Sequence, residues 1–419
     1  MMEQRGYLLQ SLAMFDLRHF LSGLILLPVF FAAVAAPADF TGVETDPASG
    51  FSRAVIVPPK ALAHTAQFLP LSDAGEIAGQ GHPEVQAGRV LDNLAAALTE
   101  AKTSLDQLVR LNVYARDAAT AAAVRRVLTE RLRGPVKPAV TFVTGQTTHP
   151  DALVAMDAVA VTTMTSPQVV YQRSAKISGI GGTHVAVLPL GGHVYIAGQA
   201  EPGTLAEATR KTMDSLRSTL KFLELDFSHV VSVKSFIQPI GSGFEARAEI
   251  VKQFGGQPAP PLVFVEWTMT NPIEIEMVAA AGDAPRQAQE PIEYLTPPGM
   301  TASPIYSRVA RVNRGDLIYT GGLYGPSGAS GEGQVRDIFA QLKTLMEKSG
   351  SDFRHMAKAT YYVSDNDAST MLNKIRPGFY DPKRPPAASK AMVPGVGLEG
   401  RSITLDMIAV RRPAANVAP

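Results

Sequence analysis

The chain has 419 residues, of which 46% are hydrophobic and 18% are charged, so it has the composition of a folded globular protein and is too long for one ordinary core. Its 39 Lys and Arg residues nearly balance its 38 Asp and Glu residues, so no overall field favours nucleic acid or acidic lipid. It has no cysteine, which excludes disulfides, thiolate metal sites, a cysteine nucleophile and lipid attachment through cysteine.

The first element in chain order is an uncharged apolar run from Phe20 to Ala36, which follows Arg18 and ends in the small residues 33–35. This pattern is typical of a secretory signal peptide. We therefore expect residues 1–36 to be an export signal, with Met14 as an alternative start, and the mature protein to be periplasmic or secreted. The alternative is an uncleaved membrane anchor, although the run is shorter than the roughly 20 residues that a spanning helix needs. No other membrane contact is expected.

A segment pattern then recurs three times, with Arg110, Lys234 and Lys358 as equivalent points 124 residues apart (234 − 110 and 358 − 234). In each copy a basic residue leads into a β-prone run. A period this long indicates a whole small domain, because solenoid and propeller repeats run at roughly 20 to 50 residues. The predicted modules span residues 52–161, 169–281 and 295–410, with short linkers at 162–168 and 283–293 between them.

Within each module the sequence predicts strands, a helix, a strand, a second helix and further strands. The first helix carries one apolar stripe, as at Leu91, Leu94 and Leu98. In the second module, Thr204 and Glu207 fit a capping box at the start of this helix. Both helices have a single apolar face, which favours a mixed sheet with two helices on one face. Strands are expected at 153–161, 193–196, 273–279, 317–320 and 403–410.

The other face of each sheet is apolar as well. Tyr195 alternates with Val194 and Ile196, and neighbouring strand residues point to opposite faces, so these side chains cannot all lie under the helices. An exposed apolar face of this size marks an interface. We therefore expect an α+β fold in which three modules pack around a pseudo-threefold axis, as a monomeric pseudo-trimer.

Several segments, in this order and repeated, resemble the Rid family (RidA/YjgF type). They are VYIAGQ from Val194, IYTGG from Ile318, the helix QAGRVLDNLAAAL from Gln86, YYVSD from Tyr361 and IEIEMVA from Ile273. The similarity covers nearly all of the mature chain. It implies a chorismate-mutase-like fold for each module, with pockets at the clefts between modules.

The resemblance also implies a chemistry. Family enzymes hydrolyse enamines and imines formed from amino acids, with an Arg after a Pro-Ala pair holding the substrate carboxylate and a Glu in the last strand positioning water. A guanidinium suits this task because its planar fork binds a carboxylate bidentately. Here the arginine position is occupied by Val140, Leu262 and Ala388, and the glutamate position by Ala155, Glu274 and Thr404. No copy keeps the Arg.

Glu274, Lys390 and Lys137 are the candidate catalytic residues. Lys390 falls on the same strand face as Ala388, and Lys137 lies three residues before Val140. Either lysine can hold a carboxylate as a point charge, and Glu274 can contribute to a composite cleft. The alternative interpretation is that the lysines are solvated and Glu274 is a strand residue at an interface.

The resemblance assigns further residues to ligand binding. Tyr306 and Phe51 match the pocket tyrosine of the family, and packed aromatics are the alternative. The segments matching its Ser-Gly-Gln strand end contribute Thr65, Gln67, Ala197, Gln199 and Thr320, whose backbone amides can matter more than their side chains.

Other chemistries find little support in the sequence. His64 and His184 are the histidine candidates for acid or base work, with structural roles as the alternative. No histidine spacing fits a metal site, so no metal or cofactor is expected. The Gly-rich run 321–333 lacks the Gly-Lys-Ser/Thr of a phosphate-binding loop and is predicted to be a flexible connection.

Three functional hypotheses follow. The first is an exported, divergent Rid-fold protein that binds a small carboxylate-bearing metabolite at the clefts without efficient deaminase chemistry. The second is catalysis at one asymmetric cleft, as a 2-iminobutanoate/2-iminopropanoate deaminase-like hydrolase or in another reaction. The third is a structural or partner-binding module.

Overall fold

The computed structural model describes residues 39–46, 49–179, 181–282 and 290–413. The expected export signal at 1–36 lies outside the described residues. Over the part of the chain that is described, no helix combines the length and the apolar content needed to cross a bilayer.

The same order of elements occurs three times along the chain: three strands, a helix, a strand, a helix and two strands. The first group runs from β1 to β6, the second from β7 to β12 and the third from β13 to β18. The helices are α1 (Pro83–Glu100), α2 (Ala118–Arg131), α3 (Leu205–Phe222), α4 (Gly243–Lys252), α5 (Gly331–Lys348) and α6 (Asn366–Ile375).

The strands of the first group are β1 (Thr41–Thr45), β2 (Ser52–Val57), β3 (Leu62–Thr65), β4 (Leu108–Ala115), β5 (Ala139–Thr144) and β6 (Val154–Val161). Those of the second are β7 (Val170–Gln172), β8 (Val185–Leu188), β9 (His193–Gln199), β10 (Val230–Ile237), β11 (Leu262–Glu266) and β12 (Ile273–Ala280). Those of the third are β13 (Ile292–Leu295), β14 (Val309–Val312), β15 (Leu317–Thr320), β16 (Met356–Val363), β17 (Ala387–Met392) and β18 (Ile403–Val410).

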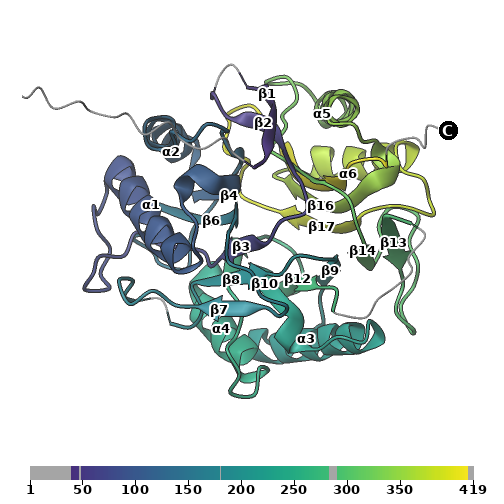
Figure 1. Ribbon diagram of the computed structural model, residues 1–419. Coiled ribbons are helices and arrows are strands. Elements are labelled where there is room, and N and C mark those ends of the chain that lie inside the picture. The colour runs from purple at the N-terminus through teal and green to yellow at the C-terminus, as the bar shows by residue number, and fades with distance from the viewer. Residues whose placement is uncertain (1–38, 47–48, 180, 283–289, 414–419) are drawn as a thin grey trace, which may run out of the picture. The chain divides into compact units, whose positions relative to one another are not determined.

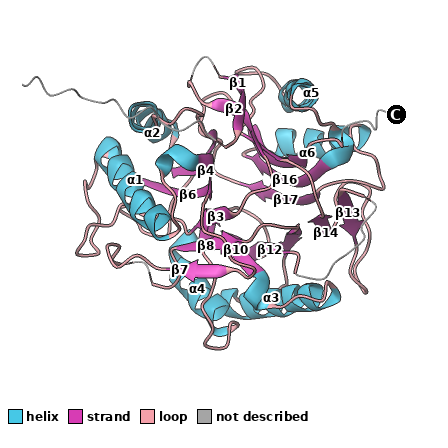
Figure 2. Ribbon diagram, viewed as in Figure 1, coloured by secondary structure: helices cyan, strands magenta, loops and turns pink. Residues whose placement is uncertain are grey.

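The described strands form two mixed sheets, one of 12 strands and one of six, and each group contributes the same central pairing to them. In the first group β4 pairs in parallel with β5 and antiparallel with β6, and β10 and β16 repeat this pairing with their own neighbours. The two helices of each group cover one face of that group's central strands, which leaves the strands of the three groups facing one another (Figures 1 and 2). The predicted α+β architecture, with two helices on one face, is what the described chain adopts.

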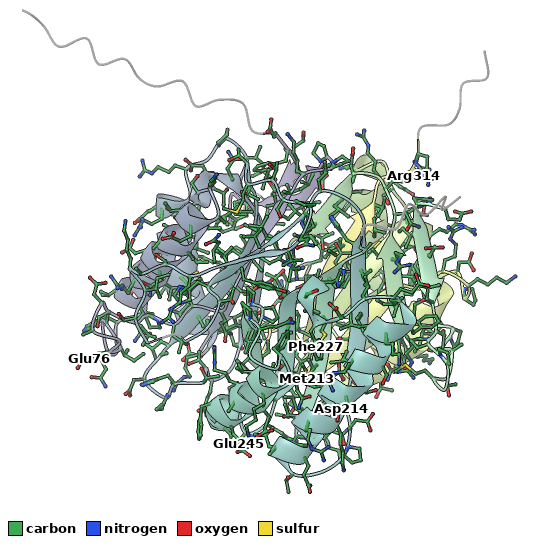
Figure 3. All side chains as sticks on the ribbon, turned by 60° about the horizontal axis from the view of Figure 1, so that its bottom comes forward. Glu76, Met213, Asp214, Phe227, Glu245 and Arg314 are labelled. Carbon is green, nitrogen blue, oxygen red and sulfur yellow. The ribbon has the colours of Figure 1, made fainter. Side chains whose placement is uncertain are left out.

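The helices form where the sequence places apolar stripes and caps. Thr204 and Glu207 make the predicted capping box at the start of α3, with each side chain bonding the backbone of the other residue. Along the same helix, Met213 is fully buried while its neighbour Asp214 lies on the outside and pairs with Arg217 at 2.9 Å (Figure 3). The stripe of α3 therefore faces the sheet.

The strands alternate between two cores. Val194 and Ile196 of β9 pack in the core beneath α3 and α4, whereas Tyr195 packs on the opposite face with residues of the other two groups, among them Val159 and Ile408. Every second residue of each inner strand therefore enters a core that all three groups share. This core is where the faces predicted to be interfaces are buried.

Strand pairing also joins the groups. The third strand of each group pairs antiparallel with the second strand of another: β3 with β8, β9 with β14, and β15 with β2. The first and third groups are therefore joined by the same kind of strand pairing as groups that are adjacent in the sequence.

Strand register corrects the predicted equivalence of the basic residues. Arg110 and Lys358 both follow a bulge and pair with Val159 and Ile408, but the residue that follows the corresponding bulge of β10 is Ser232. Lys234 is opposite Glu276, as Asn112 is opposite Asp157. The equal spacing of 124 residues therefore does not mark equivalent positions.

Two strands lie outside the predicted module limits. β1 pairs with β2 and begins before residue 52, and β13 begins at Ile292 inside the predicted linker 283–293. Both are short edge strands that carry no long apolar run.

Candidate functional site

Three junctions bring the end of the third strand of one group to the fifth strand of another. The segment after β3 meets β11, which we call the Gln67 junction. The end of β9 meets β17, which we call the Glu274 junction. The segment after β15 meets β5, which we call the Arg125 junction. Each fifth strand carries one of the family arginine positions Leu262, Ala388 and Val140.

The Gln67 junction is closed by hydrogen bonds. The amide of Gln67 donates to Leu262 O at 3.1 Å, its side-chain nitrogen donates to Phe264 O at 2.9 Å, and its side-chain oxygen accepts from Phe264 N at 3.3 Å. Gln67 is 6% exposed. Both ends of the side chain are therefore used to join the segment after β3 to β11.

The Glu274 junction is organised by the hydroxyl of Ser389 in β17. This hydroxyl accepts from the amide of Gly198 at 3.1 Å and donates to Glu276 Oε2 at 2.7 Å. Glu274, two residues before Glu276 in β12, is half-buried on the same side. A protein hydroxyl thus stands where the other two junctions use a backbone carbonyl of the fifth strand.

The carboxyl of Glu274 titrates in the neutral range. Burial and the charge of Glu276 raise its pKa to about 7, against opposition from Ser389 and the lysines Lys358 and Lys390. Desolvation disfavours the charged form of a carboxyl, and a like charge acts in the same direction. A carboxyl with this pKa can both give and take a proton near neutral pH.

Lys390 shares the electrostatic environment of Glu274. It lies on the same face of β17 as Ala388, since the parallel pairing with β16 is regular, and its ammonium donates to Ser369 Oγ of α6 at 3.0 Å. Burial and Arg376 lower the pKa of Lys390, while Glu274 acts against that shift. The two candidates from different groups therefore influence each other.

Three predicted binding residues also lie at the Glu274 junction. Tyr306 precedes Ser307, whose amide donates to Pro386 O at 2.9 Å just before β17. Ala197 donates its amide to Arg308 O at 2.9 Å. Gln199 turns its side-chain nitrogen toward Thr219 of α3 at 2.9 Å. Tyr306 and Ala197 thus flank the junction, while Gln199 bonds its own helix.

The Arg125 junction holds a cavity of about 450 Å³ between the first and third groups. Phe51, one of the predicted binding residues, lines it together with Val140 at the arginine position. The two glycines after β15 make backbone hydrogen bonds at the edge of the cavity. Gly321 N donates to Arg53 O at 2.9 Å, and Gly322 N donates to Val140 O at 3.0 Å. The glutamate position of this junction is Thr404, whose hydroxyl donates to Leu323 O at 2.9 Å.

Four other candidates have structural partners. The hydroxyls of Thr65 and Thr320 accept the amides of Ala158 and Met407, both at 2.9 Å, within their own groups. Lys137 donates to Leu132 O at the end of α2, and His184 Nδ1 accepts from Ser174 N at 3.1 Å. These contacts engage the hydroxyls of Thr65 and Thr320, the ammonium of Lys137 and one ring nitrogen of His184.

A layer of charged residues lies between the groups, in the shared core. Arg110 pairs with Asp406, and Lys358 pairs with Glu276 at 2.8 Å, so each pair joins two different groups. Burial opposes the ionisation of Asp406, but Arg110, Lys234 and Lys358 together hold its pKa below the ordinary value.

His64 borders the same layer. A cavity of about 40 Å³ is lined by His64, Arg110, Lys234 and Lys358 among others, which is room for a few water molecules. Burial, with help from His193 and Arg110, lowers the pKa of His64 to about 3. His64 is therefore neutral at physiological pH.

Two residues at the junctions escaped prediction from the sequence. Ser389 follows the family arginine position, but nothing in the sequence shows that its hydroxyl connects Gly198 with Glu276. Arg125 belongs to α2 and reaches the cavity beside Val140. The sequence offers one signal for Arg125, namely that it borders the apolar stripe of its helix. Within the described ranges, no cluster of His, Asp and Glu fits a metal ion.

Comparisons with known proteins agree on the family. The family model described as endoribonuclease L-PSP matches residues 41–162. A RutC family protein of Pyrococcus abyssi is 32% identical over 122 residues, which are 29% of this chain and 93% of the relative. A RutC family protein of Synechocystis is 36% identical over 85 residues, which are 20% of this chain and 65% of the relative.

Solved structures also match single stretches of the chain. A YjgF family member of Neisseria meningitidis is 22% identical, with 29% of this chain and 97% of that chain covered and a TM-score of 0.23. A Rid family protein of unknown function from Yersinia pestis is 24% identical, with 29% and 98% covered and a TM-score of 0.28. The match to nearly the whole Pyrococcus relative shows that the chain belongs to the Rid family, also called the RutC or YjgF family.

Proposed function

We propose that this chain is an exported Rid family protein that binds a small carboxylate-bearing metabolite between its groups of elements, without efficient imine hydrolysis. The observation that carries the proposal is the occupancy of the arginine position. Val140, Leu262 and Ala388 stand there, so no junction has a guanidinium at the strand position from which the family arginine holds the substrate carboxylate.

We further propose that the three groups of elements are tandem Rid-like modules, at 52–161, 169–281 and 295–410, which pack as an intramolecular pseudo-trimer. The recurring element order and the pairing of β3 with β8, β9 with β14 and β15 with β2 support this arrangement. The apolar run before Ala36 supports export.

Binding of a carboxylate is supported by the cations that remain near two junctions. Lys390 lies beside Glu274, and Arg125 lines the cavity beside Val140. The matching family model bears the name endoribonuclease, but the near-zero net charge of this chain provides no electrostatic attraction for RNA.

The test combines an activity assay with a binding assay on the purified mature chain. Imino acids are generated in situ by an amino-acid oxidase, and their loss is timed against buffer. Binding of stable carboxylates, pyruvate and phenylpyruvate, is followed by calorimetry. We expect saturable binding and no hydrolysis above buffer. A rate well above buffer would overturn the non-catalytic part of the proposal, and the absence of binding by any carboxylate would overturn the rest.

A second candidate function is acid–base catalysis at the Glu274 junction. It is favoured by one observation, namely that the pKa of Glu274 is raised to about 7 next to Lys390. If the imine assay does give a rate, we expect that rate to disappear in Glu274→Gln and to fall in Lys390→Met. A rate that survives both substitutions would exclude this junction as its source.

A further inference from the structure

The cavity at the Arg125 junction has apolar and aromatic walls. Phe51, Val140, Phe142, Leu323 and Leu398 contribute to its lining, and they come from both the first and the third group. Its volume of about 450 Å³ falls within the range of roughly 300 to 1,000 Å³ that small-molecule sites occupy. The walls suit a flat, apolar ligand body, since aromatic rings stack on one another with favourable geometry.

Charged side chains in the lining of this cavity are Asp46, Arg53 and Arg125, and the charge of Asp46 acts on Arg125. The other arginine in the lining, Arg53, already bonds Gln341 and lies 4.0 Å from Glu44. Arg125 donates to Gly397 O at 3.0 Å and stands 4.0 Å from the centre of the Phe142 ring. No acidic side chain within the described ranges forms an ion pair with Arg125. Arg125 also lies near the Tyr324 hydroxyl, and its remaining N–H donors can be offered to a ligand.

The guanidinium of Arg125 lies over the ring of Phe142. A guanidinium held over an aromatic face keeps its edge donors free, and these donors match the two oxygens of a carboxylate. Burial lowers the pKa of Arg125, and a bound carboxylate would relieve that unfavourable desolvation. An arginine held in this way is suited to binding one carboxylate.

Tyr324 offers a second polar group. Its hydroxyl is buried, and no described group meets it with hydrogen-bond geometry, although Thr404 and Arg125 lie near it. The hydroxyl would stand 3.3 Å from a Cβ atom at Gly322, and that glycine also lines the cavity. A buried polar group without a partner is costly unless a ligand or water supplies one.

We propose that the Arg125 cavity binds a monocarboxylate with an aromatic or similarly apolar body, its carboxylate held by Arg125 and Tyr324 and its body packed against Phe51 and Phe142. This proposal rests on the proposed function, and it assigns carboxylate binding to the Arg125 junction and to one class of ligand. Arg125 comes from α2, not from the strand position that carries the family arginine. Thr404 stands in place of the family glutamate at this junction.

The experiment uses the mature chain and two probes, phenylacetate and pyruvate, in calorimetric titrations. Phenylacetate should bind more tightly than pyruvate because it fills the apolar walls. Arg125→Gln should weaken phenylacetate about tenfold or more, as loss of a charge-assisted contact does, and Tyr324→Phe should weaken it less. The matched control is Arg126→Gln, which removes the next arginine of α2, an exposed residue paired with Glu84 at 2.8 Å, and should leave binding unchanged.

Leu398→Trp provides an independent test, because it fills the cavity from a loop and leaves Arg125 in place. It should abolish phenylacetate binding, so the inference stays testable if Arg125→Gln does not fold. Phenylacetate binding that persists in both variants would overturn the inference. If pyruvate binds and its binding depends on Lys390 and not on Arg125, the proposed function stands at the Glu274 junction and this inference fails. If neither probe binds, both fail.

Discussion

The carboxyl of Glu274 occupies the space in which a side chain at position 198 would begin, since a Cβ atom on Gly198 would stand 1.9 Å from Glu274 Oε1. Glycine at 198 therefore lets the carboxyl lie against the backbone whose amide bonds Ser389. Gly198 and Glu274 of the second group and Ser389 of the third group are thereby held close together.

Gly198→Ala should displace this carboxyl toward solvent. With less burial, the pKa of Glu274 should fall from about 7 toward the ordinary value for Glu. Carboxyl carbon chemical shifts across a pH titration measure the change. Gly241→Ala is the control, because nothing lies within 4 Å of a Cβ there, and it should leave the titration unchanged. An unaltered midpoint in Gly198→Ala would show that burial of Glu274 does not depend on this glycine.

Glu274 should make folding weaker as the pH rises toward neutrality. Its folded pKa of about 7 exceeds the unfolded value, so the folded state binds more protons between about pH 4.5 and 7, and the free energy of unfolding falls across that window. Glu274→Gln should remove this fall. Urea unfolding at a series of pH values measures it, and parallel profiles for the wild type and the variant would contradict the prediction.

His64 should change the pH dependence of the free energy of unfolding in the opposite direction. Its folded pKa of about 3 lies below the unfolded value, so the unfolded state binds more protons between about pH 3 and 6.5, and the free energy of unfolding rises with pH there. His64→Gln should flatten this rise. Acid unfolding of the two proteins provides the comparison. His193, whose pKa is lowered to about 4 by burial, should leave part of the rise in place.

The ion pair between Arg110 and Asp406 should show strong coupling. Arg110→Met leaves a buried carboxylate without its partner and should reduce the free energy of unfolding by about 3 to 5 kcal/mol. Arg110→Met combined with Asp406→Leu should lose less than the sum of the two single variants. A double-mutant cycle measures the difference. Additive losses would mean that the pair contributes no mutual stabilisation.

Much of the fold follows from local sequence signals. Thr204 and Glu207 predict the start of α3, and the alternation around Tyr195 predicts which side chains leave the helix-covered core. These features depend on residues close together in the chain. The edge strands β1 and β13 were missed because they are short and lack an apolar pattern.

The site was less accessible from the sequence, because its atoms are brought together by register. The strand register places Lys234 two residues beyond the position that is equivalent to Arg110 and Lys358, and the equal spacing along the chain conceals that offset. The hydroxyls of Thr65 and Thr320 match a pocket motif, yet both satisfy backbone amides. Arg125 reaches its cavity from a helix that no family motif covers.

The pairing of β2 with β15 has a consequence for biosynthesis. One edge of β2 is covered early by β1, but the other edge is completed by β15, which leaves the ribosome only after the whole of the first two groups. At about 5 to 20 residues per second, β2 waits on the order of ten to fifty seconds with that edge open. An unpaired edge is a template for association between chains. The growing polypeptide is therefore most exposed to aggregation before its last third has been translated.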